Sequence, residues 1–200
     1  REALYKSINL VSIRVLLEVG AGKVLKHVDK FGFNSEKFPR NTQLAIGGGT
    51  MGVAPIDMAQ AYAVIANGGF LVQARIINKV TDQDGDIVFL PERTEVFSSA
   101  SSENSTNLIE KDELNPLYPM SKPAPQVLDK RNSFIVDSML QDVIQKGTGR
   151  RARSLKRSDL AGKTGTTDDA QDTWFNGYNS ALVTSVWVGF SDQALSLIHI

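Results

Sequence analysis

The 200-residue sequence contains no cysteine, which excludes disulfides, thiolate catalysis and zinc sites built on cysteine. Histidine is scarce as well: His27 and His199 are far apart, and neither belongs to a group with metal-ligand spacing. An excess of charge is also lacking, because 22 Lys and Arg residues balance 22 Asp and Glu residues. The sequence therefore predicts no metal site and no general attraction to nucleic acid or to an anionic membrane.

The sequence also lacks a long hydrophobic run. The longest apolar stretch, Ala181 to Phe190, is interrupted by Thr184 and Ser185, and it is much shorter than the roughly 20 residues that span a bilayer. The sequence begins at Arg1 without a Met or a signal peptide, so we expect a cut there, and a missing anchor says nothing about a longer protein. The content of 42% hydrophobic and 22% charged residues fits one globular domain or a piece of one.

Four stretches have the apolar spacing of a helix. Between Ala3 and Val19 the apolar residues recur at steps of three and four, which predicts one helix that Gly20 ends. A shorter helix is expected over Val24–Phe31, and a third from Pro55 to a stop at Asn67-Gly68-Gly69. The apolar side of the fourth is expected to consist of Phe134, Ile135, Met139, Val143 and Ile144.

Strand patterns fill most of the remainder. Phe70 to Leu90 predicts a hairpin with its turn at Asp84-Gly85, and the polar region of about 91–130 predicts an insertion or loop. Three short strands at Leu160–Thr166, Trp174–Tyr178 and Ala181–Phe190 predict an antiparallel meander. Since helices precede this sheet, the expected fold class is α+β.

The strongest candidate for chemistry is the stretch Ala161–Thr167, a lysine within a Gly- and Thr-rich strand. Gly165 leaves one strand face open to a peptide, Thr164 and Thr166 offer hydroxyls to a carboxylate, and Lys163 adds a positive charge. This layout suits an acyl-transfer site. The alternative, an ordinary strand with an exposed lysine, is favoured when the motif is taken alone.

The second candidate is Ser7-Ile8-Asn9. Side chains two residues apart point about 200° apart on a helix, so Ser7 and Asn9 can share one cavity only where the backbone is not helical. In the alternative, Ser7 caps the following helix and Asn9 is solvated. Taken alone, this motif favours the alternative.

Together the two motifs supply the Ser-x-Asn and the Lys-Thr-Gly, in order, of the three-motif set of penicillin-binding proteins and class A β-lactamases. Longer segments narrow the resemblance, because most of the chain resembles class A penicillin-binding proteins. The segments that carry it are Lys6–Arg14, Ile46–Gly69, Lys146–Ala152, Ala161–Thr167, Asp172–Tyr178 and Val186–Phe190.

The resemblance implies a penicillin-binding and serine β-lactamase-like transpeptidase fold, an antiparallel sheet with helices, incomplete at both ends. Residues 1–193 would be a partial transpeptidase domain with the polar insertion at about 91–130, and 194–200 would be a truncation scar or non-native tail. The implied enzyme is a serine D,D-transpeptidase that needs no cofactor. It attacks the D-Ala-D-Ala end of a peptidoglycan stem peptide, passes the acyl group to an amine, and binds β-lactams because they mimic that dipeptide.

The resemblance also assigns roles to the motif residues. Ser7 would relay a proton toward the leaving amine, Asn9 would hold the substrate amide, and Lys163 would tune Ser7 and meet the substrate carboxylate. The implied substrate-binding residues are Thr164, Gly165 and Thr166.

One part of the family pattern is absent, because no Ser in the sequence is followed three positions later by Lys. The resemblance places that nucleophile motif before Arg1, so we expect a fragment of a bifunctional, membrane-anchored protein with an N-terminal glycosyltransferase domain. The isolated chain is expected to be inactive. The longer protein would work on the periplasmic face of the bacterial inner membrane, with envelope activator proteins among its possible partners.

Three other functions stay open. A D,D-carboxypeptidase shares both motifs and differs only in passing the acyl group to water. A β-lactamase is weakened by Glu113-Leu114-Asn115, which resembles the deacylating loop of class A enzymes but has Lys111 two positions before Glu113. The third alternative is a non-catalytic penicillin-binding-like module.

Overall fold

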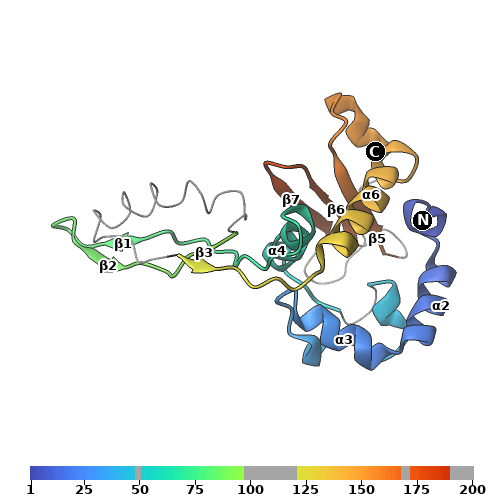
Figure 1. Cartoon of the computed structure of the whole chain (residues 1–200), viewed down its shortest axis with the longest axis horizontal. Coiled ribbons are helices and arrows are strands. Elements are labelled where there is room, and N and C mark those ends of the chain that lie inside the picture. Colours follow the sequence, from blue (N-terminus) through green and yellow to red (C-terminus); the bar gives the residue numbers. More distant parts are fainter. Residues whose placement is uncertain (48–50, 97–120, 168–171, 190–200) are drawn as a thin grey trace.

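A computed structural model describes residues 1–47, 51–96, 121–167 and 172–189. Its body is a three-stranded antiparallel sheet with strand order β5-β6-β7, and the helices α4 and α6 both pack on it (Figure 1). The strands are β5 (Ala161–Thr166), β6 (Asp172–Tyr178) and β7 (Val183–Gly189), and the helices are α4 (Pro55–Ala66) and α6 (Lys130–Gln145). The meander expected from the sequence is therefore confirmed, and so is the α+β class.

The core lies between one face of the sheet and these two helices. Leu140 and Val143 of α6 pack against Ala161 and Tyr178 of the sheet. Residues paired across antiparallel strands share a face, and Ala161 is paired with Tyr178. Lys163 lies two residues beyond Ala161 on the same strand, so the lysine and the core residues belong to one face of the sheet.

The sequence signals at α4 act as expected. Pro55 occupies the first turn, and Asp57 Oδ2 accepts a hydrogen bond from the Ala54 N–H at 3.2 Å. After the helix, Gly69 has φ +108° and a β-carbon there would lie 2.0 Å from the Leu128 carbonyl oxygen. Only glycine fits this approach, which ties the end of α4 to the segment that leads into α6.

The buried face of α6 differs in part from the predicted one: Val143 and Ile144 are buried as expected. Phe134 and Ile135, expected on the apolar side, are 73% and 52% exposed. Ser133 is buried instead, and its hydroxyl donates to the Ile65 carbonyl at 2.9 Å. With this contact to α4, the buried residues of α6 are Ser133, Leu140, Asp142, Val143 and Ile144.

The N-terminal region is a chain of short helices instead of one long helix: α1 (Glu2–Tyr5), α2 (Asn9–Val19) and α3 (Ala21–Asp29). The prediction of a single helix over Ala3–Val19 was wrong, because the chain breaks at Ser7. Two short 3-10 turns follow α3, at Ser35–Lys37 and Thr42–Ala45, and a third, η3 (Arg150–Leu155), follows α6.

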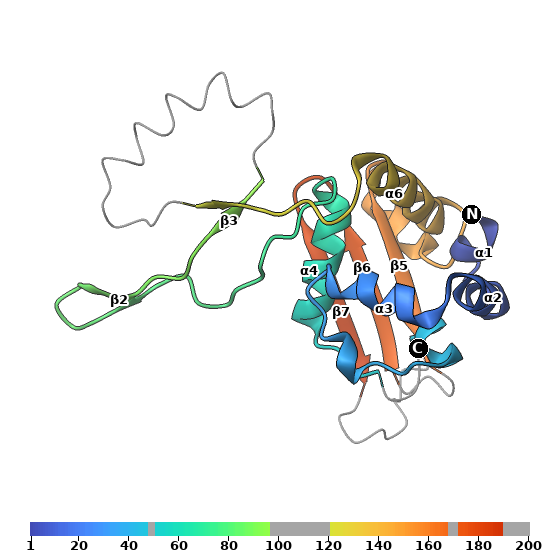
Figure 2. The same cartoon turned by 60° about the horizontal axis from the view of Figure 1, so that its bottom comes forward.

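A narrow arm extends from the body (Figures 1 and 2). It contains the antiparallel pair β1 (Val80–Thr81) and β2 (Ile87–Phe89) and the parallel pair β3 (Thr94–Glu95) and β4 (Lys122–Pro123). The predicted hairpin turn is confirmed, since Asp82 Oδ1 accepts hydrogen bonds from the Asp84 and Asp86 N–H groups at 3.0 and 2.9 Å. The predicted strands were too long.

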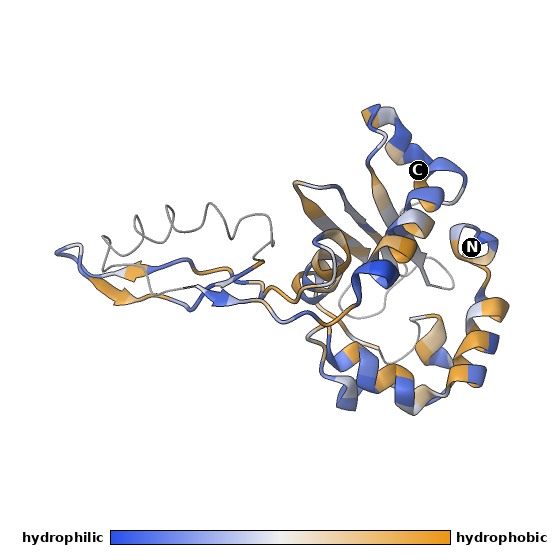
Figure 3. Ribbon diagram, in the orientation of Figure 1, coloured by the Kyte–Doolittle hydropathy of each residue, from blue (hydrophilic) through white to orange (hydrophobic). Residues whose placement is uncertain are grey.

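The polar region of about 91–130, expected to be an insertion or loop, contains the two-residue strands β3 and β4. Glu113 and Lys111 lie outside the described residues. Figure 3 shows apolar residues on the arm and on α2 as well as in the core, and Leu10, Leu17 and Val88 are exposed. Among the helices of the described ranges, none combines the length and the apolar character needed to cross a membrane.

Candidate active site

The turn between α1 and α2 gives Ser7 an unusual backbone. Ser7 has φ +56°, in the left-handed region that side-chain-bearing residues rarely adopt. The Ile8 N–H reaches back to the Ala3 carbonyl at 2.8 Å, and Ile8, whose side chain cannot cap, is the N-cap of α2. The alternative in which Ser7 caps the following helix is therefore wrong, and the non-helical backbone that a functional Ser7 requires is present.

Lys163 of β5 contacts this turn, although it lies 156 positions after Ser7 in the sequence. Its Nζ donates a hydrogen bond to Ser7 Oγ at 2.9 Å and another to the Thr164 carbonyl oxygen at 2.7 Å. Burial removes the Lys163 ammonium from water and so lowers its pKa from the usual value. Both hydrogen-bond acceptors are neutral oxygens, so neither adds a compensating negative charge. The two sequence motifs thus come together as a polar pair whose lysine gives up its proton more easily than a solvated one.

The residues after Lys163 lie along an edge strand. Within the described sheet β5 pairs only with β6, so its other edge can pair with an extended peptide. Thr164 is half-buried and Thr166 is exposed. A β-carbon on Gly165 would lie 3.3 Å from Trp174 Cβ, so this glycine also has a packing reason, which the sequence did not reveal.

Asn9 is less closely tied to the pair. It is the first residue of α2 and is exposed. Among the described residues it makes no hydrogen bond through its side chain, so it is free to contact a substrate. The structure brings Ser7 and Lys163 together, whereas no side-chain hydrogen bond within the described ranges ties Asn9 to them.

Sequence reasoning missed one residue next to the pair. Thr148 Oγ1 lies 2.5 Å from Thr164 Oγ1, and the Thr148 N–H donates to the Tyr5 carbonyl at 3.1 Å, just before the Ser7 turn. The only signal in the sequence was its place between Gly147 and Gly149 in a family-like segment.

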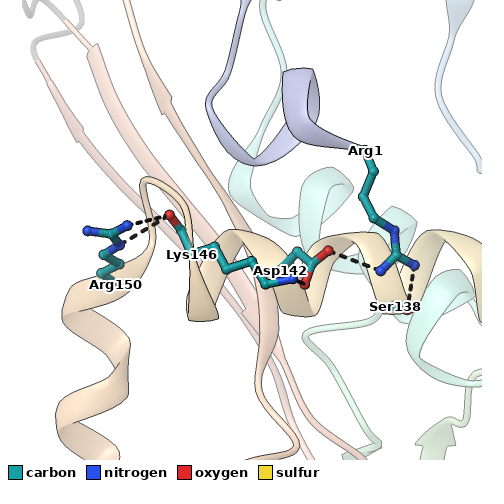
Figure 4. A network of polar contacts seen from close by, with 5 residues as sticks. All are labelled: Arg1, Ser138, Asp142, Lys146 and Arg150. Carbon is teal, nitrogen blue, oxygen red and sulfur yellow. Dashed lines mark hydrogen bonds and ion pairs between the residues drawn. The ribbon is translucent and has the colours of Figure 1, made fainter.

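A polar network holds α1 against α6 (Figure 4). Arg1 donates to Asp142 Oδ2 at 3.0 Å and to Ser138 Oγ at 2.7 Å, and Lys146 pairs with Asp142 Oδ1 at 2.9 Å. The hydrogen bond from Lys146, assisted by the charges of Lys146 and Arg1, holds the pKa of Asp142 below its usual range despite partial desolvation. Arg150 adds two hydrogen bonds to the Lys146 carbonyl. The network anchors the start of α1 and so supports the Ser7 turn.

The hollows found among the described residues lie away from the Ser7–Lys163 pair. A shallow hollow of about 230 Å³ lies between α2, α3 and the turn at Thr42–Ala45, and neither Ser7 nor Lys163 lines it. Within the described ranges no group of three or more acidic or histidine side chains could hold a metal ion. The Ser7–Lys163 pair lies beside the edge strand β5, with Ser7 exposed and Lys163 half-buried.

Comparison with known proteins agrees with this geometry. A family model described as the penicillin binding protein transpeptidase domain matches residues 1–194. Penicillin-binding protein 1A of Pseudomonas aeruginosa is 43% identical over a 218-residue alignment that covers 98% of this chain and 26% of that protein. Penicillin-binding protein 1A of Neisseria meningitidis serogroup A is 38% identical over 190 residues, covering 95% of this chain and 21% of that protein.

Solved structures show the same fold. The crystal structure of penicillin-binding protein 1A from Haemophilus influenzae matches with a TM-score of 0.75 and 29% identity, over 96% of this chain and 30% of that one. The D,D-transpeptidase domain of a peptidoglycan glycosyltransferase from Eggerthella lenta, at 22% identity, matches in fold with a TM-score of 0.64, over 93% of this chain and 47% of that one. The chain thus spans about a quarter of the curated relatives, and it belongs to the family of penicillin-binding protein transpeptidase domains.

Proposed function

We propose that this chain is part of a longer class A penicillin-binding protein, called the parent protein below, that cross-links peptidoglycan as a serine D,D-transpeptidase. The observation that carries the proposal is the hydrogen bond from Lys163 Nζ to Ser7 Oγ at 2.9 Å. It joins the Ser-x-Asn and Lys-Thr-Gly motifs, which are far apart in sequence, at one surface. A chance Lys-Thr-Gly in an ordinary strand has no reason to meet a serine held in a left-handed turn.

The reaction has two balanced steps. In the first, the nucleophilic serine of the parent protein attacks the carbonyl carbon of the penultimate D-Ala, an ester forms, and the amide C–N bond breaks to release D-Ala. Ser7 donates its hydroxyl proton to the departing nitrogen and regains a proton from the nucleophile. In the second, an acceptor amine attacks the ester, a new amide forms, and its lost proton returns through Ser7 to the serine.

Lys163 has two tasks in this scheme. Its hydrogen bond orients the Ser7 hydroxyl, and its lowered pKa reduces the free-energy cost of sharing a proton with Ser7. Its positive charge also attracts the terminal carboxylate of the stem peptide. Asn9, whose side chain is exposed at the start of α2, would bind the peptide amide.

The edge of β5 suits the substrate backbone. A stem peptide lying beside β5 would add a strand to the sheet, as extended peptides do at exposed edges. Thr164 and Thr166 then offer hydroxyls to its carboxylate, and Gly165 between them leaves room for close approach. A β-lactam carries a carboxylate and a strained amide in the same relative places, so it would acylate the same serine.

Further parts of the parent protein follow from the family. Residues 1–193 would form part of the transpeptidase domain, with the insertion at about 91–130, and 194–200 would be a tail outside it. The nucleophile motif, a membrane anchor and a glycosyltransferase domain would precede this chain. The active site of the parent protein would lie on the periplasmic side of the inner membrane, where it would encounter stem peptides and activator proteins.

Labelling with fluorescent penicillin tests the proposal. The parent protein and this chain are incubated with the probe, with a sample blocked beforehand by unlabelled penicillin as control, and any adduct is mapped by peptide analysis. We expect a slowly hydrolysed adduct on a serine of the parent outside residues 1–200 and none on this chain. A parent that folds without labelling would overturn the proposal. Rapid release of hydrolysed penicillin would favour a β-lactamase, and release of D-Ala without cross-links would favour a carboxypeptidase.

A further inference from the structure

Thr148 occupies a tight turn that connects three parts of the site. The N–H groups of Gly147 and Gly149 both donate to the Val143 carbonyl near the end of α6, at 3.1 Å each. The Thr148 N–H lies between them and donates to the Tyr5 carbonyl at 3.1 Å. The backbone of Thr148 is thereby fixed to α6 and to the segment that leads into Ser7.

The hydroxyl of Thr148 faces β5. Its Oγ1 lies 2.5 Å from Thr164 Oγ1, which makes the two hydroxyls hydrogen-bond partners. Thr148 is exposed and Thr164 is half-buried, so a ligand from solvent can reach this pair. Both residues are β-branched, and the resulting stiffness about χ1 limits where their hydroxyls can point.

The single proton on each hydroxyl determines the direction of the hydrogen bond between Thr148 and Thr164 when a carboxylate is bound. Each hydroxyl has one proton to donate, whereas a carboxylate can only accept. If Thr164 donates to Thr148, it has no proton left for a carboxylate. When a carboxylate binds Thr164, the bond between the two threonines must therefore run from Thr148 to Thr164, and the Thr164 proton points at the ligand.

We infer that Thr148 is a positioning residue: it donates its hydroxyl proton to Thr164, and this directs the Thr164 proton to the carboxylate of the stem peptide or β-lactam. A chain of two donors pointing the same way polarises its second member, which strengthens the bond to the carboxylate. The inference rests on the function proposed above, since it assumes that Thr164 meets the carboxylate. Because the Thr148 backbone also binds Tyr5, the residue sets the carboxylate site in register with the Ser7 turn.

The test measures the second-order rate of acylation of the parent protein by fluorescent penicillin. Thr148→Val keeps the shape and removes the hydroxyl, whereas Thr148→Ser keeps the hydroxyl. Loss of one neutral hydrogen bond in such a network predicts a rate about 3- to 10-fold lower for Thr148→Val. Thr148→Ser should restore most of that loss. In a Thr164→Val background, Thr148→Val should add less than about a twofold change, because its effect passes through Thr164.

A second readout separates positioning from damage to the fold. Each variant is also acylated with the methyl ester of the same penicillin, which lacks the anionic carboxylate. The ratio of the acid rate to the ester rate is independent of how much protein is folded, and we expect it to fall in Thr148→Val and to recover in Thr148→Ser. An unchanged ratio, or an equal loss in the Thr164→Val background, would overturn the inference. A wild-type parent that is not acylated at all would instead overturn the proposed function and this inference with it.

Discussion

Gly147 and Tyr5 approach so closely that a β-carbon on Gly147 would lie 2.2 Å from the Tyr5 carbonyl oxygen. This carbonyl also accepts the Thr148 N–H. The close approach fixes the end of α1, two residues before Ser7, against the turn that follows α6. Even a methyl group at position 147 would therefore move the Ser7 turn.

Gly147→Ala tests this relationship. Since the obstacle is backbone and cannot rotate away, we expect a loss of about 1–3 kcal/mol in the unfolding free energy of the domain. Penicillin acylation should also slow, because Ser7 moves away from Lys163. The measurements are thermal unfolding and acylation rates of the parent protein. Gly22→Ala is the matched control, because nothing lies within 4 Å of its new β-carbon and it lies in a helix; a similar loss in both variants would contradict the account.

The left-handed backbone of Ser7 leads to a second prediction. Alanine and glycine both remove the hydroxyl, but only glycine adopts φ +56° without a steric penalty. We expect Ser7→Gly to be more stable than Ser7→Ala by about 1 kcal/mol, while both variants lose most acylation activity. Paired unfolding and labelling experiments on the parent protein check this. Equal stability would mean that the turn relaxes when the side chain is removed.

The partly buried hydrogen bond from the Tyr178 hydroxyl to Asp137 Oδ1, at 2.8 Å, leads to a third prediction. Tyr178→Phe removes one hydrogen-bond donor from the Asp137 carboxylate, whose other oxygen accepts a hydrogen bond from Gln141 Nε2. We therefore expect the free energy of unfolding to fall by about 1–2 kcal/mol. Tyr62→Phe is the control, because burial raises the pKa of Tyr62 to about 12 but its hydroxyl makes no hydrogen bond to the described residues. Thermal unfolding should show a clearly larger loss for Tyr178→Phe, and the reverse order would count against this role of Asp137.

Local sequence signals were sufficient for the sheet and for α4. The three strands are predicted by β-rich runs separated by turns, and α4 is predicted by Pro55 at its start and Asn67-Gly68-Gly69 at its end. These residues determine the structure of their immediate neighbours, so they can be recognised in the sequence alone. The break at Ser7 could not be found this way. The apolar spacing of Leu4, Ile8 and Val11 continues through it, and the contacts around the break come from Gly147 and Lys163, far away in sequence.

The buried face of α6 and the role of Thr148 were hidden for the same reason. Phe134 and Ile135 fit a helical apolar stripe, but the position of α4 decides which side is covered. Thr148 is an ordinary threonine in sequence and becomes a candidate only because β5 brings Thr164 within hydrogen-bonding distance. Lys163 was found because its neighbours form a recognisable motif.

The lowered pKa of Lys163 leads to a pH-dependent prediction. Burial shifts the folded-state pKa below the value of 10.5 that the unfolded chain has. Below the folded-state pKa the lysine is charged in both states, so the full cost of burying the charge is present. Between the two pKa values the unfolded state binds more protons, so stability rises with pH, and above 10.5 the gain is complete.

Lys163→Met and Lys163→Arg separate this effect from the rest of the protein. Methionine has no charge at any pH and arginine keeps its charge throughout, so neither variant should show the contribution of Lys163 to the rise. The free energy of unfolding of the domain is measured for wild type and both variants at several pH values from 7 to 10. We expect the wild type to gain stability relative to both variants as the pH increases. If the stability difference between wild type and the variants does not change with pH, the Lys163 ammonium is as well solvated in the folded protein as in the unfolded chain. Burial would then not lower the pKa of Lys163.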